Sequence, residues 1–314
     1  MLSRRQEFEL ITAIKGRGEI PLKFAYLGEG VKNWDNIAKH RSLKGGINTT
    51  ESILLRNKIA NFITSYEKTK KINVVDIGCG NGIPAYPVLE ELKKNNLSFK
   101  YIPIDISKEM LELAIKNIKS AFGNIECKSF QLDFELGNFS EIIYELKKDE
   151  SSNLLLFLGS TLGNHSDRNR VLTNFRDSMT SEDYLIIGVE LTNIAKINKI
   201  LPNYEGKLSE DFVYFIPEKI GINRKDTKYD VSWNDKLNQV EVKIILKKDA
   251  NIKIGSEKFK LEKDEQILLA ISVKFTEWSI TKLLSDVGFR TELLTTTKDR
   301  GYILSMVQPT RYAV

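Results

Sequence analysis

Five short apolar segments alternate with stretches of helical spacing between residues 73 and 191, and this alternation constrains the fold more than any other feature. The segments are NVVDIG (73–78), FKYIPIDIS (99–107), IECKSFQLDF (125–134), NLLLFLGS (153–160) and DYLIIGVEL (183–191). Strands that alternate with helices build a parallel sheet covered by helices on both faces. The sequence therefore predicts a doubly wound α/β sheet.

The pattern changes after residue 192. Period-two alternation with turn signals over residues 228–275 predicts antiparallel strands. A helix is expected from 276 to Gly288, followed by two strands within 289–309. We therefore expect a core made of residues 61–192 and 285–314, and a second α+β lobe assembled from residues 1–60 and 193–284.

Composition excludes several classes of protein. The chain has 314 residues, and its 47 Lys+Arg against 42 Asp+Glu give a net charge of only +5, which argues against a dedicated nucleic-acid binder. Two cysteines and two histidines are too few for a disulfide framework or a cysteine- or histidine-rich metal site. No apolar run reaches the roughly 20 residues that cross a bilayer, and the N-terminus lacks a secretory apolar stretch. We expect a cytoplasmic protein without a metal or a membrane partner; its oligomeric state stays open.

The loop after the first predicted strand reads Asp76-Ile-Gly-Cys-Gly-Asn-Gly82. Glycines at 78, 80 and 82 let the chain turn sharply and let a ligand approach the main chain, with helix N–H groups facing it. A dinucleotide-binding loop would require glycine where Ile83 stands. The observed spacing is typical of a loop that binds S-adenosylmethionine (SAM), so we expect Asp76, Gly78, Gly80 and Gly82 to contact SAM. A strand-to-helix turn without a ligand is the alternative.

Acidic residues also follow the second and third predicted strands. Asp105 is placed to accept hydrogen bonds from ribose hydroxyls, because Ser107 can serve as the N-cap of the next helix. Asp133 can meet an adenine amino group while the Phe134 ring packs on the base, although Asp133 alone could equally be a turn residue. Ligands of open α/β sheets bind at this edge.

The fourth predicted strand ends in Phe157-Leu-Gly-Ser-Thr-Leu-Gly-Asn164. This stretch closely resembles the F-L-G-S-T-I-G-N signature of the histidine-specific methyltransferases, SAM-dependent Nα-methyltransferases of ergothioneine biosynthesis with relatives in ergot alkaloid pathways. The resemblance covers about residues 20–309 and implies a class I (Rossmann-like) SAM methyltransferase core with a second, substrate-binding lobe. Further similar stretches, in order, are IPLKFAY (20–26) with Gly30 and Trp34, YIPIDIS, QLDF, VSWND and ISVKF (271–275).

The resemblance also implies roles for single residues. Asn164 is expected to hold the amino and carboxylate end of a small-molecule acceptor beside the methyl group, because its amide can both accept and donate hydrogen bonds. We take it as the residue that acts in catalysis. The implied SAM contacts are Gly78, Gly80, Asp105, Asp133, Phe134 and Gly159, and the implied acceptor contacts besides Asn164 are Tyr26, Trp34, Tyr204, Ala270 and Ser272.

The sequence departs from the family mainly on the acceptor side. Family members that use histidine carry a glutamate that pairs with the imidazole, and Ala270 stands at that position. Loss of such a buried partner costs about 1–3 kcal/mol. Gly45-Gly46 and Ile47-Asn48-Thr49 replace a tyrosine pair and a P-T-R motif, and Pro84 replaces a lysine of the SAM loop. We therefore expect an acceptor nitrogen of an amino acid or derivative, but not histidine itself.

No dedicated general base is evident in the sequence. Glu190 at the end of the fifth predicted strand and His165 beside Asn164 are the candidates, and an exposed loop histidine is the favoured interpretation of His165. Two other functions remain open: a methyltransferase acting on tRNA or protein, and a non-catalytic SAM-binding protein. The carboxylates of Asp105 and Asp133 argue against the second.

Overall fold

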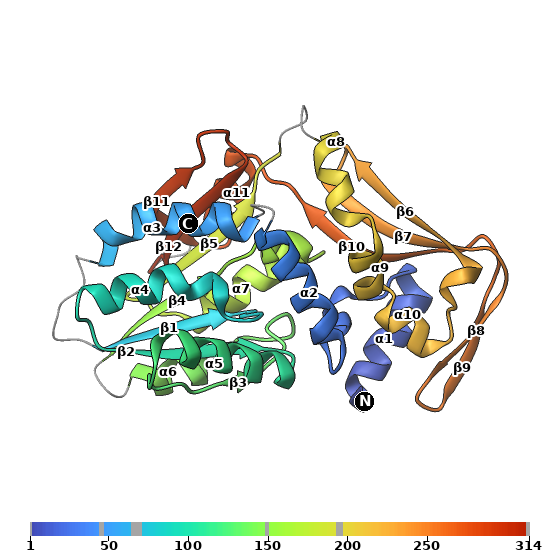
Figure 1. The fold of residues 1–314 in the computed structure, drawn as a ribbon, viewed down its shortest axis with the longest axis horizontal. Helices are drawn as coiled ribbons and strands as arrows, with labels where there is room; N and C mark the ends of the chain where they lie inside the picture. Colours follow the sequence, from blue (N-terminus) through green and yellow to red (C-terminus); the bar gives the residue numbers. More distant parts are fainter. Residues whose placement is uncertain (1, 44–46, 64–70, 148–150, 193–196, 312–314) are drawn as a thin grey trace. The chain divides into compact units, whose positions relative to one another are not determined.

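A seven-stranded sheet organises the larger part of the computed structural model, which describes residues 2–43, 47–63, 71–147, 151–192 and 197–311. The strand order is β11-β12-β5-β4-β1-β2-β3 (Figure 1). The first five strands along the chain are parallel, and β12 runs antiparallel between β5 and β11. Their bounds are β1 (Ile72–Ile77), β2 (Phe99–Asp105), β3 (Phe130–Gln131), β4 (Ser152–Phe157), β5 (Tyr184–Glu190), β11 (Phe289–Thr296) and β12 (Tyr302–Pro309). The predicted α/β fold is confirmed.

The chain divides into two compact units: a core unit of residues 38–192 and 274–314, and a lobe of residues 1–37 and 193–273. Residues 38–60 and 274–284, which we expected in the lobe, belong to the core unit. The reason is packing: α3 (Ile47–Ile63) contacts α4 (Tyr86–Lys94) and β12, and α11 (Glu277–Asp286) contacts β11.

Helices cover both faces of the core sheet. One face buries Val74, Leu154 and Leu156 against α3, α4 and α5 (Lys108–Phe122). Side chains alternate along a strand, so Phe157 points to the other face, where its ring lies 4.9 Å from that of Phe175. That face carries α6 (Ser140–Lys147) and α7 (Arg168–Ser178).

Local sequence explains why α5 forms where it does. Ser107 caps it by accepting a hydrogen bond from the Met110 N–H at 3.3 Å, as predicted. The buried residues Met110, Ala114 and Ile118 recur at helical spacing. The third strand is shorter than the predicted 125–134, because most residues of 124–131 keep exposed side chains at the sheet edge and gain little from pairing.

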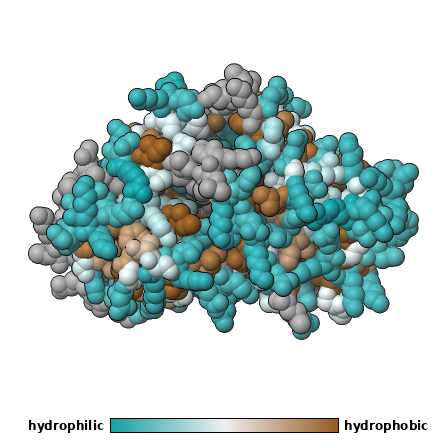
Figure 2. Space-filling view, viewed as in Figure 1, coloured by the Kyte–Doolittle hydropathy of each residue, from teal (hydrophilic) through white to brown (hydrophobic). Residues whose placement is uncertain are grey.

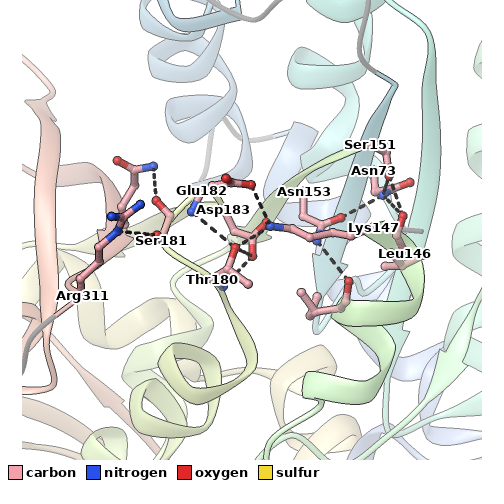
Figure 3. Close-up of polar contacts among 12 residues, drawn as sticks. Asn73, Leu146, Lys147, Ser151, Asn153, Thr180, Ser181, Glu182, Asp183 and Arg311 are labelled. Atoms are coloured by element: carbon pink, nitrogen blue, oxygen red, sulfur yellow. Dashed lines mark hydrogen bonds and ion pairs between the residues drawn. The ribbon is translucent and has the colours of Figure 1, made fainter. Parts of the chain in front are cut away.

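A buried polar network, drawn in Figure 3, anchors the sheet at the amino ends of β1, β4 and β5. Asn73 donates to Ser151 Oγ at 2.7 Å and to Asn153 Oδ1 at 2.9 Å. The fully buried Asp183 accepts from the Thr180 N–H at 2.7 Å and pairs with Lys147 at 2.9 Å. Satisfying these buried groups stabilises the sheet at the end away from the strand tips that carry the predicted site.

The lobe combines short helices with antiparallel strands, as the period-two alternation predicted. Its three-stranded sheet has the order β10-β7-β6, and β8 and β9 form a separate hairpin. Leu10, Phe24 and Ile244 are among its fully buried residues. Its helical elements are α1 (Arg4–Arg17), η1 (Leu22–Tyr26), α8 (Ile197–Ile200), η5 (Leu201–Tyr204), α9 (Lys207–Val213), α10 (Phe215–Ile220) and η6 (Arg224–Asp226), and α2 (Gly30–Leu43) begins in the lobe. Its strands are β6 (Thr227–Asn234), β7 (Gln239–Leu246), β8 (Ala250–Ile254), β9 (Glu257–Leu261) and β10 (Gln266–Val273).

The surface is predominantly hydrophilic on the face shown in Figure 2, with brown apolar side chains scattered among teal ones. Among the described residues, no helix combines the length and the apolarity that a membrane span requires.

Candidate functional site

The glycine-rich loop at the carboxyl end of β1 adopts the backbone that its sequence requires. Gly78, Gly80 and Gly82 have φ values of 61°, 54° and 76°, a region that residues with a Cβ rarely adopt. A Cβ on Gly78 would lie 3.6 Å from both the Phe134 ring and the Thr161 methyl group. The loops after β1, β3 and β4 therefore meet at Gly78, as expected for the carboxyl ends of neighbouring parallel strands.

Asp76 lies just before this loop and is 2 % exposed. The Tyr101 hydroxyl donates to its Oδ2 at 2.6 Å. Burial raises the pKa of Asp76 to about 8; the Tyr101 bond opposes this shift, and the charges of Asp105 and Glu51 add to it. Without a bound cation, the carboxyl group of Asp76 is therefore largely protonated at neutral pH.

Asp105 ends β2 and is also buried. It accepts a hydrogen bond from the Ser107 N–H at 3.0 Å, and further backbone bonds come from Gly80 and Ile106. Burial raises its pKa to about 6, while these hydrogen bonds lower it. Because Ser107 caps α5, Asp105 does not serve as the helix cap.

Phe134 packs in an aromatic cluster next to the glycine loop. Its ring makes edge-to-face contacts with Phe157 at 5.6 Å, Phe175 at 5.6 Å and His165 at 5.5 Å. Asp133 accepts from the Glu135 N–H at 3.1 Å, as a turn residue does. This cluster offers an apolar, aromatic wall beside the loop.

The F-L-G-S-T-L-G-N stretch forms a tight turn after β4. Gly159 and Ser160 both have left-handed backbone, with φ values of 72° and 59°. The 3-10 turn η3 (Thr161–Asn164) follows at once and ends at Asn164. The turn thus places Asn164 at the carboxyl edge of the sheet, on the side where Asp76 and Asp105 end their strands.

Glu51 of α3 is the site residue that the sequence analysis missed. It is 1 % exposed and accepts hydrogen bonds from the Gly159 N–H to both carboxylate oxygens at 3.0 Å and from the Tyr302 hydroxyl. Burial raises its pKa to about 7, and these two hydrogen bonds lower it. The available signal was an acidic residue on the same helical face as the apolar Leu54 and Leu55.

His165 is not the exposed loop histidine that the sequence favoured. Its side chain is only 10 % exposed because the ring packs against Phe134 and Phe157. Its Nδ1 lies 2.9 Å from Glu135 Oε1. Its buried Nε2 has no hydrogen-bond partner within the described part of the chain. The histidine is thus a buried member of the aromatic cluster.

Two other candidates for chemistry have partners or surroundings that limit them. Glu190, the geometric candidate for a base, forms an ion pair with the buried Lys274. Burial, together with the charges of Asp105 and Asp76, raises the pKa of the Cys79 thiol, so Cys79 stays protonated and is a poor nucleophile.

The predicted acceptor-binding residues other than Asn164 belong to the lobe. The structure brings Tyr204 and Ser272 together, since the Tyr204 hydroxyl donates to Ser272 Oγ at 2.8 Å. The rings of Tyr26 and Trp34 lie 6.3 Å apart. Ala270 is half-buried two residues before Ser272 on β10. Asn164 and the predicted SAM contacts belong to the core unit.

The residues at the strand tips fit SAM. The left-handed glycines leave room at Gly78 that a side chain would fill. The buried carboxyl groups of Asp76 and Asp105 would be stabilised in their charged form by the positive sulfonium and ammonium groups of SAM. Together, the strand order, the glycine loop and the acidic strand ends define the class as SAM-dependent methyltransferase.

Comparison with known proteins gives the family. A model described as "Histidine-specific methyltransferase, SAM-dependent" matches residues 7–309. The chain belongs to this family, and the predictions of family, enzyme class and cofactor are confirmed. The assignment of single contacts to SAM or to the acceptor stays a prediction.

Individual relatives are distant. The chain is 22% identical over 262 residues to the N-methyltransferase imqF of Aspergillus flavus, covering 76% of this chain and 68% of that protein. Magnesium protoporphyrin IX methyltransferase from Synechocystis PCC 6803 aligns over 92% of this chain and 98% of its own, with 10% identity and a TM-score of 0.47. The 1,6-didemethyltoxoflavin-N1-methyltransferase of Burkholderia thailandensis aligns over 92% and 90%, with 10% identity and a TM-score of 0.45.

Proposed function

We propose that this methyltransferase transfers the methyl group of SAM to the amino nitrogen of a small acceptor, an amino acid or a derivative, and that histidine is not this acceptor. The observation that carries the second part is Ala270, which stands where histidine-using members of the family are expected to have a glutamate. Its half-buried methyl side chain cannot pair with an imidazole. The resemblance to a protein named as an N-methyltransferase supports nitrogen as the accepting atom.

SAM, when bound, supplies an electrophilic methyl group whose transfer to a neutral amine is favourable. The protein then has to hold the amine with its lone pair directed at the methyl carbon. We propose that Asn164 does this, with its amide oxygen accepting from the amine N–H and its amide NH2 donating to a carboxylate or carbonyl of the acceptor. In the lobe, the hydrogen-bonded Tyr204 and Ser272 are proposed to bind the remainder of the acceptor.

The proton lost from the amine after methylation has to leave the site. The Glu190 carboxylate is occupied by its ion pair with the buried Lys274. We therefore propose that the proton passes to water. We further propose that the enzyme acts in the cytoplasm on a small molecule and not on nucleic acid, which its modest net charge of +5 supports.

The proposal is tested by an acceptor panel. The purified protein is incubated with SAM and free amino acids, amino-acid amides, short peptides, aryl-alkyl amines and tRNA, and the products are measured by mass spectrometry. We expect a mass gain of one methyl group on a small amine. Methylation of tRNA alone, or micromolar binding of histidine by calorimetry in the presence of S-adenosylhomocysteine, would overturn it.

A further inference from the structure

Glu51 and Tyr302 form a buried pair that the proposed chemistry does not use. They are 251 residues apart in the chain, and the Tyr302 hydroxyl donates to Glu51 Oε1. Both side chains are within 2 % of complete burial. Neither position belongs to the motifs from which SAM or acceptor contacts were predicted.

The pair holds the backbone of one turn from two sides. The Gly159 N–H donates to both oxygens of Glu51 at 3.0 Å, and a backbone hydrogen bond joins Ser160 to the Tyr302 hydroxyl. The Ser160 Oγ in turn accepts from the Glu190 N–H at 3.0 Å. Two successive N–H groups of a left-handed turn are thus fixed by side chains from other elements.

The neighbouring strand leaves room for this arrangement. Gly188 lies in the middle of β5, and a Cβ there would overlap both the Glu51 carboxylate and the Tyr302 hydroxyl. A buried carboxylate is unfavourable unless its hydrogen bonds are satisfied, so an apolar residue at position 51 would serve packing alone better. The polar Glu51–Tyr302 pair is therefore explained by its hydrogen bonds to the Gly159–Ser160 turn and not by packing.

The turn leads directly to Asn164. The Gly163 N–H donates to the backbone oxygen of Ser160 at 3.0 Å, and Thr161 Oγ1 donates to the backbone oxygen of Leu158 at 2.7 Å. These bonds hold residues 158–163 together, and Asn164 follows as the last residue of η3. Ser160 precedes η3 directly and has the left-handed backbone that residues with a Cβ rarely adopt.

We propose that Glu51 and Tyr302 are positioning residues: by fixing the Gly159–Ser160 turn they set the orientation of Asn164. This inference rests on the proposed role of Asn164, but the geometry that it predicts can be tested without any acceptor. Charged groups that face Glu51 are Asp76 at the end of β1 and, through Tyr302, Glu190 at the end of β5.

The test uses the side-chain amide signal of Asn164 in NMR spectra of the full chain, assigned by its absence in Asn164→Asp. We expect this signal to shift with pH in the wild-type protein with a midpoint near the raised pKa of Glu51, about 7. The Glu51→Gln variant should lose this component, because an amide does not ionise. In Tyr302→Phe the midpoint should rise, since the Tyr302 hydrogen bond lowers the pKa of Glu51.

Asp183→Asn is the matched control, because Asp183 is an equally buried, hydrogen-bonded carboxylate at the opposite end of the same sheet (Figure 3). It should destabilise the fold and leave the Asn164 profile unchanged. His165 is present in every variant. Because the charge of Glu51 raises the pKa of Asp76, Asp76→Asn is measured as well, and it should keep the component with a midpoint near 7. An identical Asn164 profile in wild type and Glu51→Gln, or an equal change in Asp183→Asn, would overturn the inference.

A second measurement separates positioning from cofactor binding. Affinity for S-adenosylhomocysteine should stay within about threefold of wild type in Glu51→Gln and Tyr302→Phe, while kcat on the amine found by the panel falls about tenfold or more. A large loss of S-adenosylhomocysteine affinity with an unchanged kcat would make Glu51 a cofactor residue instead. A panel without any methylated amine would contradict the proposed function and leave the NMR test intact.

Discussion

In the ligand-free protein, Asp76→Asn should reduce the loss of folding stability that occurs as the pH rises from 5 to 8. Burial raises the pKa of Asp76 from 3.8 to about 8, so the folded protein holds a proton there that the unfolded chain releases near pH 4. Between these values the folded state binds more protons than the unfolded state, and stability falls as pH rises through the folded pKa. Asparagine keeps the size and can still accept the Tyr101 hydrogen bond, but it carries no charge.

The magnitude follows from the linkage relation. Each pH unit between the two pKa values costs about 1.4 kcal/mol, so wild type should lose about 4 kcal/mol relative to Asp76→Asn between pH 5 and pH 8. For a chain of 314 residues that difference corresponds to about 6 °C in Tm. The assay is thermal melting of both proteins at pH 5, 6, 7 and 8 without ligand. Melting temperatures that run parallel over this range would refute the assignment of a protonated Asp76 to the ligand-free fold.

Three further outcomes follow from single positions. Gly188→Ala should lower the free energy of unfolding by about 2 kcal/mol or more in denaturant titrations, because the added Cβ overlaps the buried Glu51–Tyr302 pair. Gly137→Ala, where the added Cβ meets open space, should change it little. Equal effects of the two substitutions would contradict the close packing around Gly188. Ala270→Glu should raise histidine affinity about tenfold in calorimetry with S-adenosylhomocysteine, because an imidazole regains a charged partner; no gain would remove the argument from Ala270. Cys79 should resist iodoacetamide at pH 8 in the native protein because its pKa is raised, and peptide mass spectrometry showing it modified as fast as the half-buried Cys127 would contradict this.

The backbone geometry of the loop after β1 and the start of α5 could be predicted from the sequence because their signals are local. The glycines at 78, 80 and 82 and the Ser107 cap are needed by the backbone where they stand, so their spacing in the chain already indicates their geometry. The third strand shows the limit of that reasoning. Residues 125–134 have strand-like composition, but the side chains of 125–133 are exposed or half-buried at the sheet edge. Within the described chain, pairing with β2 is confined to an isolated bridge at Cys127 and to Phe130–Gln131.

The unit boundaries and Glu51 depend on contacts that no local pattern contains. Residues 47–60 of α3 were expected in the lobe, yet the helix packs on β12 at the other end of the chain, and this packing brings Glu51 to Tyr302. A charged residue on a buried helical face is costly in isolation and becomes acceptable only when Gly159 and Tyr302 provide its hydrogen bonds. The sequence signal for such a residue is therefore an acidic residue on a helical face whose other residues are apolar and expected to be buried. Because burying a carboxylate costs free energy that only its hydrogen-bond donors offset, the donors show which part of the structure the carboxylate fixes. An acidic residue at such a position should therefore be examined as a site residue before it is treated as a packing defect.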